Sequence, residues 1–167
     1  NLLLMDEMLL ETNNKLYVVR GNHDCPIFWD KSKGLNLPKF QNLFLVEDYS
    51  VYTIEDKQVL FVGGGISIDR TIRKDDKPYA TWWKDEEFEL DISKLNKAVR
   101  YANNIDIVVT HTAPMLAYPK NFNNQIVKDW TGVEKIHGND LIKDLANERY
   151  SMNDIYEHII LFVDFRY

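Results

Sequence analysis

The chain has 167 residues, of which 45% are hydrophobic, a length and composition that suit one domain with one core. Its 20 basic and 26 acidic residues give a formal charge of −6, which argues against a broad surface for nucleic acid or anionic membrane. The single cysteine, Cys25, cannot form an internal disulfide, and no apolar run approaches the ~18–20 residues of a membrane span, so a cytoplasmic location is expected.

The first half of the chain predicts a helix followed by strands. Apolar residues dominate positions 2–10, which predicts a helix with a broad apolar face. Three consecutive glycines, at 63–65, permit close approach of the backbone and end a strand abruptly. Short apolar runs bounded by turn residues predict buried strands at 16–19, 43–46, 50–54 and 58–62.

The second half adds helices and a further buried strand. Residues 70–83 are charged and aromatic without a clear period, which indicates a long loop and a candidate lid. Apolar spacing predicts a helix at 92–103, and an apolar run predicts a strand at 105–109. A helix at 136–145 and a final strand at 159–163 complete the predicted elements. Strands that alternate with helices and at least one hairpin predict an α/β fold with a mixed sheet.

A cluster of polar residues, Arg20-Gly21-Asn22-His23-Asp24, directly follows the first predicted strand. Open α/β sheets bind their ligands at the carboxyl ends of strands, so this position suits a functional site. Asn22 offers a neutral oxygen to a divalent ion, His23 can donate a proton or bind a metal, and Asp24 could orient the imidazole. The alternative is an Asx-type turn with exposed polar side chains.

Two further strand ends carry similar chemistry. The strand at 105–109 leads into His111, which is either a hydrogen-bonded structural residue or a metal ligand. The glycine-rich turn GGGISIDR, at 63–70, follows another apolar strand. Because His23 and His111 occupy matching positions after their strands, the pattern favours one shared site.

These blocks, GNHD at 21–24, GGGISIDR at 63–70 and VTHTAP at 109–114, resemble the calcineurin-like metallophosphoesterase family, in which they recur in this order. Motifs support the resemblance over roughly 16–114, and the tryptophan-containing stretch at 82–86 is similar to a segment of some bacterial and phage members. The resemblance implies an α/β/β/α layered sandwich, with the whole chain forming a single partial domain that is incomplete at both ends.

The resemblance also implies roles for the motif residues. Asn22 and His111 would be metal ligands, and His23 would contact the scissile phosphate or protonate its leaving oxygen. Asp24 would support His23. In this family two divalent ions, of the Mn, Fe, Zn or Mg class, activate the attacking water and neutralise phosphoryl oxygens. The implied activity is hydrolysis of phosphate mono- or diesters on a phosphorylated substrate, with the oligomeric state left open.

The family's Asp-x-His, Gly-Asp and Gly-His-x-His ligand motifs are not present. They look cut off rather than mutated, so the chain is expected to be a fragment that is inactive alone, because two ions need several donors, some of them anionic. The alternative is a catalytically inactive phosphoesterase-like domain that binds a partner or scaffolds an assembly. A nucleotide-binding glycine loop is disfavoured because the spacing at 63–65 fits neither the P-loop nor the dinucleotide pattern.

Other polar residues receive weaker interpretations. Arg70 and Arg73 are candidates for contact with the phosphate. His137 lies in an HGND segment that predicts the first turn of a helix, capped by Asn139 or Asp140, rather than a metal site. His158 is expected at the surface or at the edge of the core.

Overall fold

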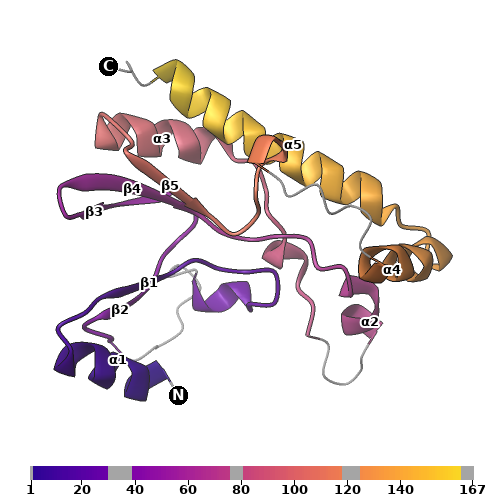
Figure 1. Ribbon diagram of the computed structural model, residues 1–167, viewed down its shortest axis with the longest axis horizontal. Helices are drawn as coiled ribbons and strands as arrows, with labels where there is room; N and C mark the ends of the chain where they lie inside the picture. The colour runs from indigo at the N-terminus through magenta and orange to yellow at the C-terminus, as the bar shows by residue number, and fades with distance from the viewer. Residues whose placement is uncertain (1, 30–38, 76–80, 118–124, 163–167) are drawn as a thin grey trace.

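The strands of the protein form two sheets (Figure 1). The larger has the order β3 (Ser50–Ile54), β4 (Lys57–Val62), β5 (Ile107–Thr110), with β3 antiparallel and β5 parallel to β4. In the smaller, β1 (Leu16–Val18) runs parallel to β2 (Leu43–Leu45). The sheets therefore confirm the mixed α/β class. The computed structural model describes residues 2–29, 39–75, 81–117 and 125–162.

The helices and sheets stack in layers. Figure 1 shows α3 (Ile92–Ala102) and α5 (Leu141–Phe162) over one face of the larger sheet. The smaller sheet lies beyond the other face, and α1 (Leu2–Glu11) packs against β2 on its far side. This order is the predicted α/β/β/α sandwich. Short 3-10 turns lie at Pro26–Phe28, Lys84–Glu86 and Met115–Ala117.

Strand β4 joins two cores because its side chains alternate between the faces of the sheet. Leu60 and Val62 point to the helices, where they pack in one cluster with Leu95 of α3 and Met152 of α5. Phe61, between them in sequence, belongs to a second cluster between the sheets. Rings from both sheets make stacked and edge-to-face contacts there, with centroids 4.8 to 6.5 Å apart, at Tyr17, Phe44, Tyr52 and Phe61.

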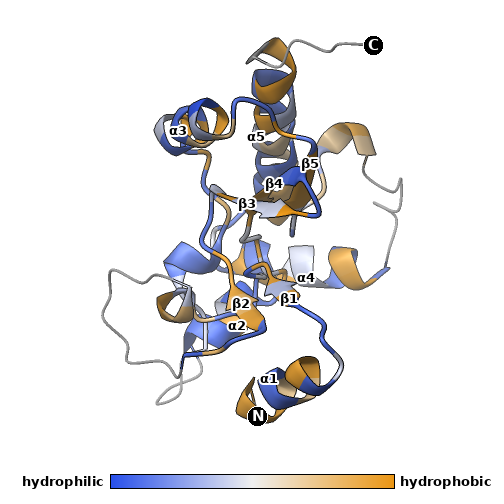
Figure 2. Cartoon of the chain, turned by 90° about the vertical axis from the view of Figure 1, so that its left-hand side faces the viewer, coloured by the Kyte–Doolittle hydropathy of each residue, from blue (hydrophilic) through white to orange (hydrophobic). Residues whose placement is uncertain are grey.

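Helix α1 is held by a polar side chain rather than by its apolar residues. Asp6 is buried and accepts hydrogen bonds from the backbone N–H groups of Gln41, Asn42 and Leu43, at 2.7 to 3.1 Å. These bonds hold the pKa of Asp6 below its ordinary value although burial opposes them. The leucines and methionines that predict the helix are largely exposed. Figure 2 shows α1 at the edge of the molecule, with hydrophobic residues coloured orange along it.

Residues 70–83 were predicted as a loop, and this prediction is wrong for its first part. Helix α2 covers Arg70–Asp75, with Thr71 and Arg73 buried. Residues 76–80, the centre of the candidate lid, lie outside the described residues. The sequence does not indicate this helix because its buried face is charged. Its arginines, Arg70 and Arg73, are neutralised by Glu134 and Glu86 from other elements.

The predicted helix at 136–145 is confirmed over 141–145 and wrong over 137–140, where one helix has ended and the next has not begun. α4 (Gln125–Ile136) stops before Gly138, which has φ 81°, a conformation that favours glycine. Asp140 accepts a hydrogen bond from Lys143 N at 3.2 Å, which confirms the predicted cap in the HGND segment. The part of the predicted strand at 159–163 that the structure describes is helical, since α5 continues to Phe162. Met152, Ile155 and Ile159 are buried on one helical face.

Among the described residues, no helix has both the length and the apolar character needed to cross a membrane. His158 bonds through Nε2 to Asn96 Oδ1 at 2.7 Å and so links α5 to α3 beside the core. Helix α5 thus packs against α3 and the core of the larger sheet, and Glu148 on α5 accepts from Ile66 N, just after β4, at 2.7 Å.

Candidate functional site

The turns after β1 and β4 pack directly against each other. Gly64 N donates to Arg20 O at 2.7 Å. A Cβ at Gly63 would lie 2.6 Å from Asp48 Oδ1 and 2.8 Å from Arg20 O, distances that no side chain tolerates. The glycines of the 63–65 turn are therefore required for close approach of two backbones, as the sequence predicts.

The buried side chain of Arg20 stabilises the contact between these two turns. It pairs with Asp48 at 2.7 Å and donates to Glu86 O at 2.6 Å. Asp48 also accepts from Gly63 N at 2.8 Å. A charged residue next to the motif is thus a structural clamp, and it holds the turn that carries Asn22 in place.

Asn22 and His111, the two predicted metal ligands, lie side by side. The distance from Asn22 Oδ1 to His111 Nε2 is 3.1 Å, and Asn22 N lies 3.3 Å from the same nitrogen. His111 reaches this position because its backbone N donates to Val62 O at 3.2 Å, which extends the β4–β5 pairing to the end of the sheet. The predicted convergence of two strand ends is therefore present in the geometry.

The His111 ring packs closely against two glycines, Gly21 and Gly65. A Cβ at Gly21 would lie 3.2 Å from His111 Cε1, and a Cβ at Gly65 would lie 3.0 Å from Cδ2. This partial burial lowers the pKa of His111, and Arg20 acts in the same direction, although Asp24 opposes both. The imidazole is accordingly neutral at pH 7, which is the form that can bind a metal.

His23 faces Asp69 rather than Asp24. Its Nε2 lies 3.4 Å from Asp69 Oδ1, and that oxygen is buried with no hydrogen-bond partner. Asp24 instead turns back, and its Oδ2 accepts from Gly21 N at 2.7 Å. Asp24 thus shapes the turn, and Asp69 of the GGGISIDR block faces the imidazole, while the support of His23 by Asp24 stays a prediction. The His23 side chain is 56% exposed and can be reached by a substrate.

Arg70 and Arg73, the predicted phosphate contacts, are both engaged with protein carboxylates. Arg70 donates to Glu134 at 2.8 Å and to Asp144 at 2.5 Å, and these bonds raise its pKa against the effect of burial. Arg73 donates to both oxygens of Glu86, at 2.7 and 2.9 Å. Their described contacts give them a structural role, and contact with a phosphate stays a prediction.

The comparison with known protein families agrees with this arrangement. The family model of calcineurin-like phosphoesterases matches residues 2–155. The chain belongs to this family. No curated protein and no solved structure matches the chain.

Calcineurin-like metallophosphoesterases generally use divalent metals. Two ligands at right angles on one ion, with bonds of about 2.1 Å, lie about 3 Å apart, close to the 3.1 Å between Asn22 Oδ1 and His111 Nε2. With the proton on Nδ1, His111 Nε2 accepts from Asn22 N at 3.3 Å, and the lone pairs of Nε2 and of Asn22 Oδ1 are the ones that a cation would use. The pair therefore fits one metal ion. No group of three His, Cys, Asp or Glu side chains suited to a metal occurs among the described residues.

Residues that sequence reasoning missed lie beneath the Asn22 turn. Ser67 and Glu86 are completely buried, and Ser67 Oγ contacts Asn22 through both its amide nitrogen and its backbone oxygen. Ser67 belongs to the GGGISIDR block, so its place after a strand was a usable signal. The sequence carried no signal for Glu86. A glutamate in a charged stretch is expected to be solvated, and only the structure shows its partner, Arg73.

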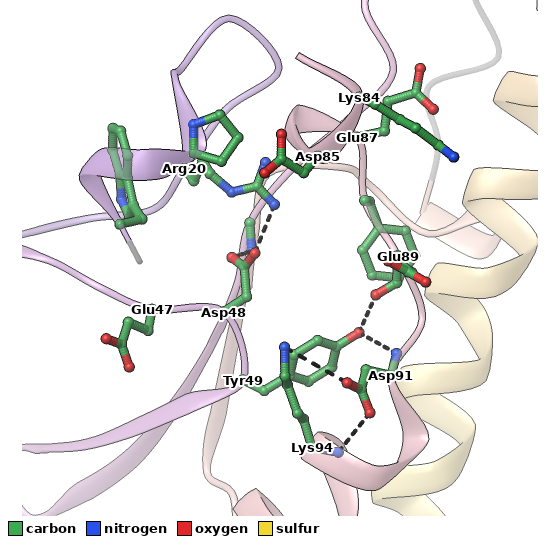
Figure 3. Close-up of a pocket in the computed structure, with 14 residues that line it drawn as sticks. Arg20, Glu47, Asp48, Tyr49, Lys84, Asp85, Glu87, Glu89, Asp91 and Lys94 are labelled. Carbon is green, nitrogen blue, oxygen red and sulfur yellow. Dashed lines mark hydrogen bonds and ion pairs between the residues drawn. The ribbon is translucent and has the colours of Figure 1, made fainter. Parts of the chain in front are cut away.

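A cavity of about 780 Å³ is lined in part by Arg20 and Gly63. Figure 3 shows carboxylates around its walls and Arg20 bound to Asp48. Tyr49 donates to Glu89 O at 2.6 Å and accepts from Asp91 N at 2.8 Å, while burial raises its pKa to about 12. An anionic ester is disfavoured there because six acidic side chains line the cavity against three basic ones: Glu47, Asp48, Asp85, Glu87, Glu89 and Asp91, with Arg20, Lys84 and Lys94.

Proposed function

We propose that this calcineurin-like phosphoesterase chain contributes to a site that hydrolyses phosphate mono- or diesters with two divalent metal ions. The observation that carries the proposal is the 3.1 Å separation of Asn22 Oδ1 and His111 Nε2 at adjoining strand ends. An exposed His23 in the same turn supports it, because the substrate can reach its ring.

Each residue would have a separate task. When bound, the ions supply positive charge to the phosphoryl oxygens and activate water for attack. Asn22 and His111 would hold one of them through neutral donor atoms. His23 would contact the phosphate or give a proton to the leaving oxygen, and Asp69 would orient its ring. Arg73 would support the turn through its bond to Asn22 O, and contact of Arg70 and Arg73 with the ester stays a prediction.

Two neutral donors do not complete a dinuclear centre, because divalent ions need several ligands, some of them anionic. We propose that the remaining ligands are contributed from outside the described residues. We further propose that the substrate is phosphorylated and that the protein works in a reducing, cytoplasmic environment. The second candidate function is a metal-free binding domain. The small donor set among the described residues favours it.

The experiment that tests the proposal is Mn²⁺-dependent hydrolysis of an aryl phosphate monoester and diester. It compares this chain with a form extended over the surrounding reading frame. His23→Ala removes the proposed proton donor in each, and His158→Ala is the matched control, because this histidine bonds to Asn96 far from the Asn22 turn. Removing a general acid lowers kcat by about 10²–10⁴-fold.

The outcomes separate the two candidates. Mn²⁺-dependent turnover that is lost in His23→Ala and kept in His158→Ala supports phosphoester hydrolysis. If the extended protein folds but shows no turnover with either ester, the phosphoesterase proposal fails and the metal-free binding domain is favoured. Turnover that His23→Ala leaves unchanged would remove His23 from the mechanism.

A further inference from the structure

Of the two proposed ligands, Asn22 depends on the rotation of its side-chain amide. A turn of 180° exchanges Oδ1 for Nδ2, and only the oxygen has lone pairs that can bind a cation. In the structure Oδ1 faces His111 Nε2 at 3.1 Å, and Nδ2 faces Ser67 Oγ at 3.1 Å. Whatever holds the amide in this rotation decides whether the turn can bind a metal.

The hydrogen-bonding capacity of Ser67 selects this rotation. Its hydroxyl has one hydrogen and two lone pairs. Oγ lies 2.6 Å from Asn22 O, and two oxygens this close need the hydrogen between them. The lone pairs then accept from Asn22 Nδ2 and from Arg73 Nη1, the latter at 2.7 Å. A reversed amide would set Oδ1 against a lone pair of Ser67 with no hydrogen to share.

The Arg73–Glu86 pair holds Ser67 in this state. Glu86 Oε1 lies 3.1 Å from Ser67 Oγ and could compete for its hydrogen. Arg73 satisfies both oxygens of Glu86 and also donates to Asn22 O at 3.1 Å. Because Ser67 and Glu86 are completely buried, water cannot replace these partners.

We propose that Ser67, held by Arg73 and Glu86, is a positioning residue that turns the Asn22 amide so that its oxygen faces His111 and the metal. The role in metal binding rests on the proposed function, whereas the rotation of the amide does not. Ser67 acts through Asn22 and does not itself touch the ion or the substrate.

The first test needs no metal. In NMR spectra of the chain, the Asn22 side-chain NH₂ protons are expected to show cross-peaks to the β-hydrogens of Ser67 and none to the His111 ring. In Ser67→Ala the NH₂ resonances should broaden or gain contacts to His111. The matched control is Thr71→Val, which removes a buried hydroxyl bonded to Glu134 in the neighbouring network. Cross-peaks to the His111 ring in the parent chain, or an amide unchanged in Ser67→Ala, would overturn the inference.

The second test titrates Mn²⁺ and follows paramagnetic broadening of the His111 and Asn22 signals, which reports even weak binding. Ser67→Ala is expected to weaken binding about 10–100-fold, the usual effect of losing a partner of a metal ligand. In an Asn22→Asp background both terminal atoms are oxygens, so the same change should cost little. Equal loss in both backgrounds would show a merely structural role and overturn the inference. If the parent binds no Mn²⁺ but keeps its amide contacts, the metal function fails and the positioning of Asn22 stands.

Discussion

Replacing Arg73 by Met removes the charge from the network beneath Asn22 while keeping most of the apolar stem. Glu86 is completely buried and receives two hydrogen bonds from this guanidinium, so the substitution leaves it without a counter-ion. Removing one partner of a buried ion pair destabilises a protein by about 3–5 kcal/mol. Ser67 Oγ and Trp83 N, at 3.1 and 3.3 Å, still contact Glu86. We therefore expect the lower end of that range.

Urea unfolding followed by tryptophan fluorescence measures this loss, and a double-mutant cycle isolates the pair. Arg73→Met combined with Glu86→Leu should regain at least half of the lost stability, because an apolar pair is often tolerated in place of a buried ion pair. Arg100→Met is the matched control, since Arg100 is exposed on α3, and should change stability by less than about 0.5 kcal/mol. A loss below about 1 kcal/mol in Arg73→Met would refute the argument that this pair supports the site.

Three further substitutions test other parts of the structure. Gly63→Ala should lower the free energy of unfolding by about 1–3 kcal/mol, because its Cβ would lie 2.6 Å from Asp48 Oδ1. The control Gly132→Ala should cause no such loss, because its Cβ would have no atom within 4 Å. Equal thermal midpoints for the two variants would contradict the prediction. Burial raises the pKa of Glu148 from 4.5 to about 7, so the folded state holds an extra proton between those values and stability falls as the pH rises through that window. Glu148→Gln keeps the acceptor for Ile66 N and should be more stable than the parent at pH 8 by up to about 3 kcal/mol, but not below pH 4.5. Urea titrations against the exposed control Glu157→Gln check this, and an unaltered pH dependence would count against it. Asp69→Asn should lower kcat about tenfold in an active form of the enzyme while KM changes little, because the ring of His23 loses its facing carboxylate; a change in KM alone would argue otherwise.

Sequence reasoning located the strands and the chemistry at their ends because both depend on near neighbours along the chain. The apolar runs that form β1, β4 and β5 are short and bounded by glycine or polar residues. A strand delivers whatever follows it to the edge of its sheet, so the positions of Asn22, His23 and His111 follow from the pattern. The need for glycine at 63 was likewise visible, since only close backbone approach explains three glycines after a strand.

The tertiary structure decided which polar groups meet. Arg70 and Arg73 resemble free phosphate ligands in the sequence, yet Glu134 lies 64 residues from Arg70 along the chain and Asp144 lies 74. Likewise, Ser67 reaches Asn22 across 45 residues, and Asp69, not the adjacent Asp24, faces His23. The helix through 159–162 replaces a predicted strand because Ile155 and Ile159 must face the same core as Leu60. Local periodicity indicates the short buried strands, whereas buried charges are neutralised only by partners that the fold brings together.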